Sequence, residues 1–189
     1  MTAGLLTVGQ PAPAVALRST SGKLVTLHSL RGKKVVLYFY PKDDTPGCTK
    51  EACDFQATRA HFAREGAIVL GVSRDDIVSH QRFSKKFHLA FPLLSDPEAA
   101  VCLAYGVYQQ KSMYGRTYWG IERTTFLIDE AGRIAAIFPK VKVNGHAQAV
   151  LEAIRSSPAK SAAAGAPHAS RGARQAASRQ RPKAHAPTR

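Results

Sequence analysis

Hydrophobic residues in the first 157 positions fall into runs that predict alternating strands and helices. The run at 35–40 is apolar or aromatic throughout, which is typical of a strand buried on both faces in the middle of a parallel sheet. Residues 67–72 form a second such run. The segments Cys48 to Arg64 and Ile77 to Phe87 are free of proline and glycine and are predicted to be helices.

Antiparallel hairpins are predicted at both ends of this region. Alternating positions at 16–18 and 23–27 flank a turn-forming segment at 19–22, and strands at 124–129 and 133–138 flank the turn at 130–132. Shorter patterns predict an edge strand at Phe91–Leu94, a helix at Glu98–Tyr105 and a closing amphipathic helix at Gly145–Arg155 that turns Val150, Leu151 and Ile154 inward. Together these elements predict an α/β fold, a three-layer sandwich with a central mixed sheet and an N-terminal β-hairpin.

The charge divides the chain into two parts. Of 189 residues, 27 are Lys or Arg and 13 are Asp or Glu, which gives a net charge of +14. Half of this charge lies in residues 158–189, which hold seven basic residues, no acidic residue, and no Leu, Ile, Val, Met or aromatic residue. Such a segment buries too little apolar surface to fold. We therefore predict a domain at 1–157 and a disordered basic tail at 158–189.

The tail has two interpretations. Its charge favours weak, non-specific contact with nucleic acid, and its lack of aromatic residues argues against sequence-specific recognition. The alternative is a solvated extension that keeps the protein soluble.

Composition also narrows the class of protein. Three cysteines are too few for a disulfide scaffold, which favours a cytoplasmic protein. No apolar run reaches the ~18 residues of a membrane span, and residues 1–14 lack the basic segment followed by an apolar one that is typical of a signal peptide. Glycine-rich phosphate loops are absent, so the sequence gives no support for a nucleotide cofactor.

The segment Pro41–Cys53 begins where the buried strand at 35–40 ends, and the carboxyl ends of such strands commonly carry functional sites. Thr45 is a good N-cap and Pro46 suits the first position of a helix, which puts Cys48 in the first turn. The unpaired N–H groups and the helix dipole there favour an ionised, reactive thiol. The alternative is that Cys48 is an ordinary small residue at a helix start.

Cys53 lies five residues after Cys48, on the far side of the same predicted helix. Ideal helix geometry separates the two Cα atoms by about 8.6 Å, beyond the roughly 7 Å that a disulfide tolerates. The pair can therefore bridge only if the first turns unwind. A zinc site would need two further ligands, and no second cysteine pair accompanies these residues.

The spacing Pro41-x-x-x-Thr45-x-x-Cys48, with Cys53 and the downstream segment 122–129, resembles the peroxiredoxin family, and within it the bacterioferritin comigratory protein or peroxiredoxin Q subgroup. The resemblance extends from about Leu6 to Arg155. It implies a thioredoxin-like fold, reduction of hydrogen peroxide and organic hydroperoxides, thioredoxin as electron donor, and a monomer.

The resemblance also implies roles for individual residues. Cys48 would be the peroxidatic thiolate that becomes sulfenic acid, and Cys53 would be the resolving thiol. Thr45 would hydrogen-bond the peroxide, Pro41 would shield the sulfur from water, and Arg123 would stabilise the thiolate and the developing negative charge. The alternative for Arg123 is a surface charge at the start of a strand.

Several residues are assigned no catalytic role. Cys102 is predicted to be a buried small residue of a short helix and a less suitable resolving partner than Cys53. Tyr118 and Trp119 either wall the site or simply pack. Five scattered histidines are predicted to be surface residues or caps, namely His28, His61, His80, His88 and His146.

Two other functions remain open at this point. The protein could associate with DNA through its tail, or it could be a redox sensor that uses the same cysteines without efficient turnover.

Overall fold

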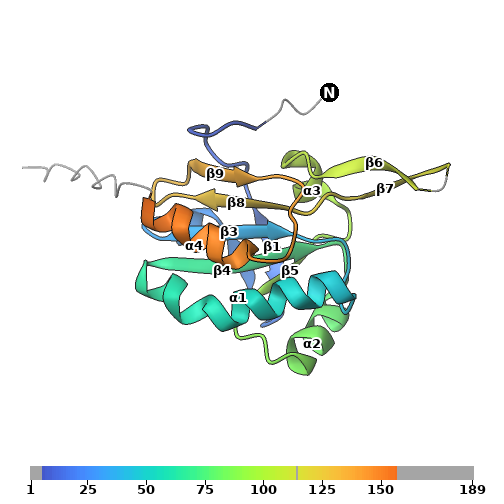
Figure 1. Cartoon of the computed structure of the whole chain (residues 1–189), viewed down its shortest axis with the longest axis horizontal. Helices are drawn as coiled ribbons and strands as arrows, with labels where there is room; N and C mark the ends of the chain where they lie inside the picture. The colour runs from blue at the N-terminus through green and yellow to red at the C-terminus, as the bar shows by residue number, and fades with distance from the viewer. Residues whose placement is uncertain (1–5, 114, 157–189) are drawn as a thin grey trace, which may run out of the picture.

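A seven-stranded mixed sheet runs through the middle of the protein (Figure 1). The computed structural model of the chain describes residues 6–113 and 115–156, so the predicted tail at 158–189 lies outside the described residues. In spatial order the strands are β2 (Leu24–Thr26), β1 (Ala16–Ser19), β5 (Leu93–Ser95), β4 (Ala67–Ser73), β3 (Lys34–Phe39), β8 (Thr124–Ile128) and β9 (Ile134–Phe138).

The central strand β3 pairs in parallel with β4 and antiparallel with β8. Both of its faces are buried, which confirms the prediction for 35–40 and the mixed character of the sheet. Because β8 runs the opposite way, its first residue, Thr124, lies beside Phe39, the last residue of β3. The carboxyl end of β3 and the entrance to β8 therefore share one edge of the sheet.

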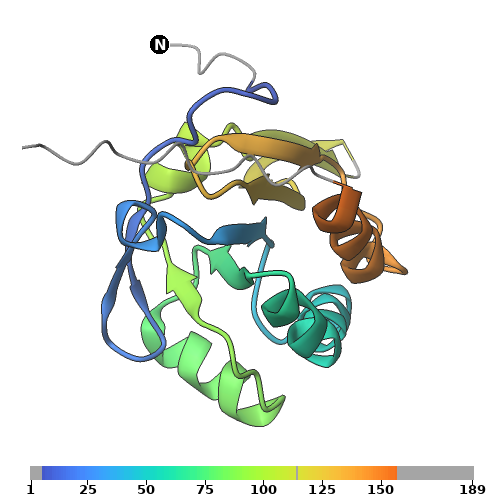
Figure 2. The same ribbon diagram turned by 90° about the vertical axis from the view of Figure 1, so that its left-hand side faces the viewer.

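Helices cover both faces of the sheet (Figure 2). α1 and α4 lie side by side on one face and α3 packs on the other, so the predicted three-layer sandwich is confirmed. No helix in the described part of the chain is long and apolar enough to cross a membrane. The helices are α1 (Pro46–Arg64), α2 (Ile77–Lys86), α3 (Ala100–Ala104), α4 (His146–Ser156) and a short 3-10 helix, η1 (His28–Leu30).

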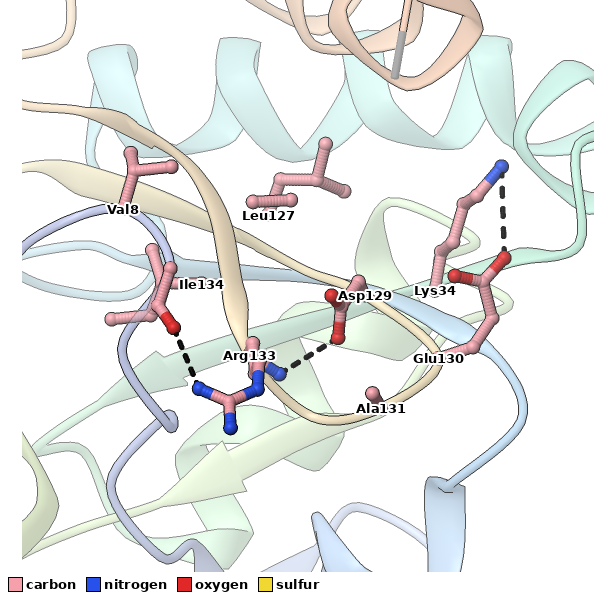
Figure 3. Close-up of a pocket in the computed structure, with 10 residues that line it drawn as sticks. Val8, Lys34, Leu127, Asp129, Glu130, Ala131, Arg133 and Ile134 are labelled. Atoms are coloured by element: carbon pink, nitrogen blue, oxygen red, sulfur yellow. Dashed lines mark hydrogen bonds and ion pairs between the residues drawn. The ribbon is translucent and has the colours of Figure 1, made fainter. Parts of the chain in front are cut away.

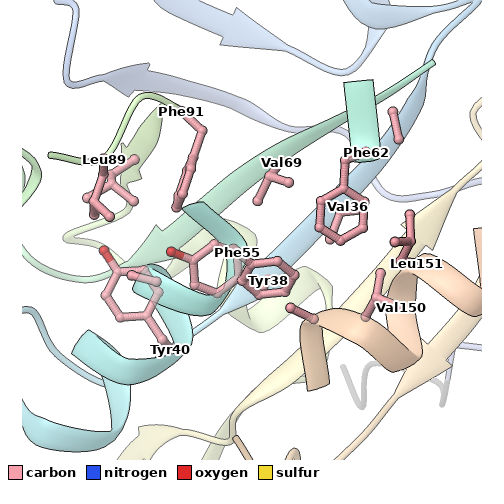
Figure 4. Packing of buried hydrophobic residues seen from close by; sticks show 14 of the residues in the cluster. Val36, Tyr38, Tyr40, Phe55, Phe62, Val69, Leu89, Phe91, Val150 and Leu151 are labelled. Carbon is pink, nitrogen blue, oxygen red and sulfur yellow. The ribbon is translucent and has the colours of Figure 1, made fainter. Parts of the chain in front are cut away.

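Aromatic side chains dominate the core between the sheet and α1 (Figure 4). The ring of Tyr38 packs on that of Phe55, with centroids 4.8 Å apart. Tyr38 also lies against Gly71 of β4, where a Cβ atom would stand 2.7 Å from the tyrosine ring and hydroxyl. Only glycine leaves room for this packing, because real Cβ atoms do not approach other heavy atoms so closely.

Two predictions about strands need correction. The strand predicted at Phe91–Leu94 as an edge strand is β5, which lies inside the sheet because the β1–β2 hairpin adds to its outer side through the Arg18–Ser95 pairing. An antiparallel ribbon of two strands, β6 (Tyr108–Met113) and β7 (Arg116–Ile121), was not predicted. The two residues between them include Gly115, a turn signal that was available in the sequence.

Candidate active site

The loop after β3 leads into α1 and places Cys48 in its first turn, as predicted. Thr45 occupies the N-cap position with an extended backbone (φ −99°, ψ 151°), and Pro46 begins the helix. The Thr45 hydroxyl makes no capping hydrogen bond and instead donates to the Lys42 carbonyl oxygen at 3.2 Å. Its oxygen lone pairs therefore remain able to accept a hydrogen bond.

Arg123 lies beside the sulfur of Cys48. Its Nη2 donates a hydrogen bond to Cys48 Sγ at 3.2 Å, and Cys48 itself is only 2% exposed. Arg123 directly precedes Thr124, which the sheet holds next to the end of β3. The topology thus brings together two residues that lie 75 positions apart in the sequence.

Glu51 completes this cluster and was missed by the sequence analysis. It lies one helical turn after Cys48, its side chain is 1% exposed, and one carboxylate oxygen forms an ion pair with Arg123 Nη1. Its other oxygen, Oε1, has no hydrogen-bond partner among the described residues. The i, i+3 spacing was the signal that could have linked Glu51 to Cys48, because such residues share a helix face.

Burial controls the charges of this cluster. It raises the pKa of Glu51 from 4.5 to about 7, although the Arg123 guanidinium acts in the opposite direction. Burial lowers the pKa of Arg123, but the charges of Glu51 and Cys48 outweigh it and raise that pKa overall. The guanidinium therefore stays charged and able to stabilise a thiolate, while Glu51 titrates near neutral pH.

Pro41, the other predicted residue of the loop, is exposed at its start. Two residues on, Asp43 is buried, and its carboxylate accepts a hydrogen bond from the Tyr40 hydroxyl at 2.7 Å. The same carboxylate lies 2.8 Å from Nδ1 of His80 in α2. No role was predicted for Asp43.

The prediction that all five histidines are surface residues or caps is wrong for His80 and His146, which are buried. Each imidazole has a hydrogen-bond partner inside the protein, Asp43 for His80 and the Thr125 hydroxyl, at 2.8 Å, for His146. Burial, assisted by the charge of Arg123, lowers the pKa of His146 from 6.5 to about 4. Three histidines are exposed, as predicted, namely His28, His61 and His88.

The three cysteines are all free, and they differ in their surroundings. Cys53 is partly exposed and belongs to the same unbroken helix as Cys48, so the predicted geometric obstacle to a bridge is present. Cys102 is fully buried in α3, as predicted, where its backbone N–H donates to the Asp96 carboxylate at 2.8 Å. Burial and the neighbouring Asp96 raise the pKa of the Cys102 thiol, which disfavours a nucleophilic thiolate there.

Figure 3 shows a pocket of about 560 Å³ on another part of the protein. It is lined by Lys34 at the start of β3 and by Asp129, Glu130 and Arg133 between β8 and β9. These residues lie at the amino end of β3, whereas Cys48 follows its carboxyl end, so the pocket does not belong to the thiol site.

Tyr118 and Trp119 lie on the exposed ribbon, where Trp119 is 58% exposed and its ring packs against that of Tyr108, with centroids 5.6 Å apart. In the part of the chain that the structure describes, no three His, Cys, Asp or Glu side chains are grouped so that they could hold a metal ion.

A comparison with protein families matches residues 8–137, more than half of the chain, to the AhpC/TSA family. The chain belongs to the AhpC/TSA family. It is 54% identical over 144 residues to a putative peroxiredoxin Bcp of Coxiella burnetii, covering 76% of this chain and 95% of that protein. It is 45% identical over 148 residues to the peroxiredoxin Bcp of Bacillus subtilis, covering 78% and 94% of the two chains.

Solved structures agree with this membership. The bacterioferritin comigratory protein of Xanthomonas campestris, studied for its alkyl peroxide reduction activity, matches with a TM-score of 0.75 at 45% identity, covering 79% of this chain and 98% of that one. A peroxiredoxin Q variant of Xylella fastidiosa matches with a TM-score of 0.76 at 39% identity, covering 80% and 96%. This AhpC/TSA protein is therefore a thiol-dependent peroxidase with a thioredoxin-like fold, which confirms the predicted family and enzyme class.

Proposed function

We propose that Cys48 is the peroxidatic residue of this peroxidase. Its thiolate attacks the terminal oxygen of a hydroperoxide, the S–O bond forms as the O–O bond breaks, and the leaving alkoxide or hydroxide takes up a proton. The cysteine is thereby oxidised to sulfenic acid and the peroxide is reduced to an alcohol or water. The observation that carries the proposal is the hydrogen bond from Arg123 Nη2 to the buried Sγ atom at 3.2 Å.

The surroundings of the sulfur support roles for three further residues. Arg123 presents a fixed positive charge to the thiolate and to the leaving oxygen, and its ion pair with Glu51 restricts its orientation. The Thr45 hydroxyl, which donates to the Lys42 carbonyl, has lone pairs left to accept the O–H of the peroxide. The shielding role of Pro41 stays a prediction.

Cys53 is the proposed resolving thiol. It attacks the sulfur of the Cys48 sulfenic acid, a disulfide forms, and water leaves. Because α1 is continuous through both cysteines, its first turns have to unwind before the sulfur atoms meet. A thioredoxin-type dithiol then reduces the disulfide and becomes oxidised itself, so that the electrons balance over one cycle.

A coupled assay with peroxide, thioredoxin, thioredoxin reductase and NADPH tests the function. We expect NADPH consumption that Cys48→Ser abolishes and that the buried-thiol control Cys102→Ser leaves intact. Consumption that does not depend on Cys48 would exclude it as the peroxidatic residue. Slow cycling without accumulation of sulfenic acid would favour the redox sensor instead.

A second variant tests the resolving step. Cys53→Ser should react with one equivalent of peroxide as fast as the wild type, and its sulfenic acid should then persist and be trapped by dimedone or over-oxidised. Normal cycling of Cys53→Ser with thioredoxin would assign resolution to Cys102 or to an outside thiol.

We further propose alkyl hydroperoxides as substrates beside hydrogen peroxide, which the activity of the Xanthomonas relative supports. Three other predictions stay open, namely a monomer, a cytoplasmic location, and weak nucleic-acid contact through residues 158–189. Equal retention on DNA at low salt by the full chain and by a chain ending at Ser157 would exclude that contact. Sedimentation tests the monomer and cell fractionation the location.

A further inference from the structure

Asp43 lies in the loop that leads to Cys48, and its carboxylate contacts residues of two different elements. Oδ1 accepts a hydrogen bond from the Tyr40 hydroxyl at 2.7 Å, at the end of β3. Oδ2 accepts from the Ser79 hydroxyl and lies against His80 Nδ1, both at 2.8 Å, from α2. We call these four residues, Tyr40, Asp43, Ser79 and His80, the Asp43 anchor.

The anchor is itself fixed in the fold. The second ring nitrogen of His80, Nε2, lies 3.2 Å from the Leu94 carbonyl oxygen in β5, and the Asp43 backbone N–H donates to the Asp75 carboxylate at 2.9 Å. The side chains of Asp43 and His80 are 4% and 0% exposed. Removing a partner from such a buried charge is strongly unfavourable, so Asp43 is a point that does not move easily.

The residues that follow Asp43 are held much more weakly. Asp44 has a left-handed backbone (φ 54°), and its ion pair with Lys86 is exposed on both sides. Pro46 and Gly47 are exposed. The buried side chains of α1 resume at Cys48 and continue with Glu51, Ala52 and Phe55. The segment 44–47 therefore has few stabilising contacts, whereas Asp43 before it and the buried face of α1 after it have many.

We propose that the Asp43 anchor is a positioning device that sets the balance between the folded first turn of α1, which reacts with peroxide, and the unwound turn, which forms the disulfide. This inference rests on the proposed function. With the anchor intact, unwinding frees only the residues after Asp43. Without it, residues 41–43 gain freedom as well, and the added conformational entropy favours the unwound state.

The anchor therefore influences the two half-reactions in opposite directions. Tyr40→Phe removes one of the three side-chain partners of the Asp43 carboxylate and retains the buried ring. We expect the rate constant for disulfide formation to rise by up to about tenfold and that for the reaction of Cys48 with peroxide to fall to a smaller extent, because the folded turn remains the major state; both are measured by stopped-flow fluorescence. His80→Ala should act more strongly, and His80→Asn, whose amide nitrogen can replace Nδ1, should restore part of the wild-type behaviour.

A matched control separates this effect from general destabilisation. Ile134→Val alters a buried residue at the opposite edge of the sheet and should leave the ratio of the two rate constants unchanged. If both constants fall together in Tyr40→Phe, or if neither changes, the anchor has no positioning role.

Hydrogen exchange provides a readout that does not need turnover. Exchange of the reduced protein at residues 46–56 should be faster in Tyr40→Phe than in the wild type. If exchange at these residues is the same in both proteins, the proposed role of the Asp43 anchor is wrong, even when the enzyme is active. Absence of any reaction between wild-type Cys48 and peroxide would instead overturn the proposed function, and the exchange result would still decide on the anchor.

Discussion

Replacing Glu51 by glutamine should remove a contribution to the stability of the protein that depends on pH. The substitution retains the shape of the side chain and removes a carboxylate that is 1% exposed. Burial raises the pKa of this carboxyl from 4.5 to about 7, even though Arg123 opposes the change. The folded protein therefore holds the Glu51 proton more tightly than the unfolded chain does, and ionisation of Glu51 destabilises the fold.

The sign and size of the effect of pH on the unfolding free energy follow from the linkage between proton binding and folding. A raised pKa in the folded state contributes stability that is fully present below pH 4.5 and is lost as the pH rises through about 7. Between pH 5 and pH 8 the loss amounts to about 2 to 3 kcal/mol. Glutamine does not titrate, so the difference in unfolding free energy between Glu51→Gln and the wild type should grow by that amount over this range, in favour of the variant.

Urea denaturation of the reduced protein at pH 5, 6, 7 and 8 measures this difference. Glu65→Gln is the control, because it removes a partly exposed carboxylate that follows the last residue of α1 and pairs with Arg155 of α4; it should change the free energy by less than about 1 kcal/mol. A difference that stays constant from pH 5 to pH 8, or that grows in favour of the wild type, would refute the reasoning. The variant should also react about tenfold more slowly with peroxide at pH 8, because an amide holds Arg123 less firmly.

Three other substitutions test separate features. Arg123→Lys should lower the rate constant with peroxide by about a hundredfold with unchanged circular dichroism, and a change below threefold would contradict its electrostatic role. Gly71→Ala should lower the free energy of unfolding in urea by about 1 to 3 kcal/mol, because its Cβ would meet Tyr38 at 2.7 Å; equal stability would disprove this close packing. The pKa of His146 is lowered from 6.5 to about 4, so His146 destabilises the fold as the pH falls through this range, by up to about 3 kcal/mol. His146→Asn should remove this contribution in acid denaturation, and an unchanged acid midpoint would count against it.

The sequence predicted most of the fold because its elements carry local signals. The apolar run at 35–40 and the proline at the start of α1 are visible without any knowledge of the neighbours. The position of β5 inside the sheet cannot be predicted locally, because it depends on pairing with β1, more than 70 residues earlier in the chain. Spatial order among short strands is a property of tertiary contacts that composition does not encode.

The residues of the active site also separate into those that the sequence predicts and those whose role depends on tertiary contacts. Cys48 and its place in the first turn follow from Thr45 and Pro46, and Arg123 was found through the family resemblance. Glu51 and Asp43 were missed because an acidic residue near a helix start normally faces solvent. Their burial depends on partners contributed by distant elements, which no spacing within the segment reveals.

The weak start of α1 limits how this protein can be engineered for use at high temperature. Gly47 is exposed in a helix, so a standard design procedure would replace it by alanine, which favours helix by about 1 kcal/mol. Its Cβ would lie 3.4 Å from Arg123 Nη2, which the structure could accommodate with only a small shift. Yet the same substitution would strengthen the turn whose opening we propose for disulfide formation between Cys48 and Cys53. A search for thermostable variants should therefore leave this turn unchanged and seek its gains at the opposite edge of the sheet.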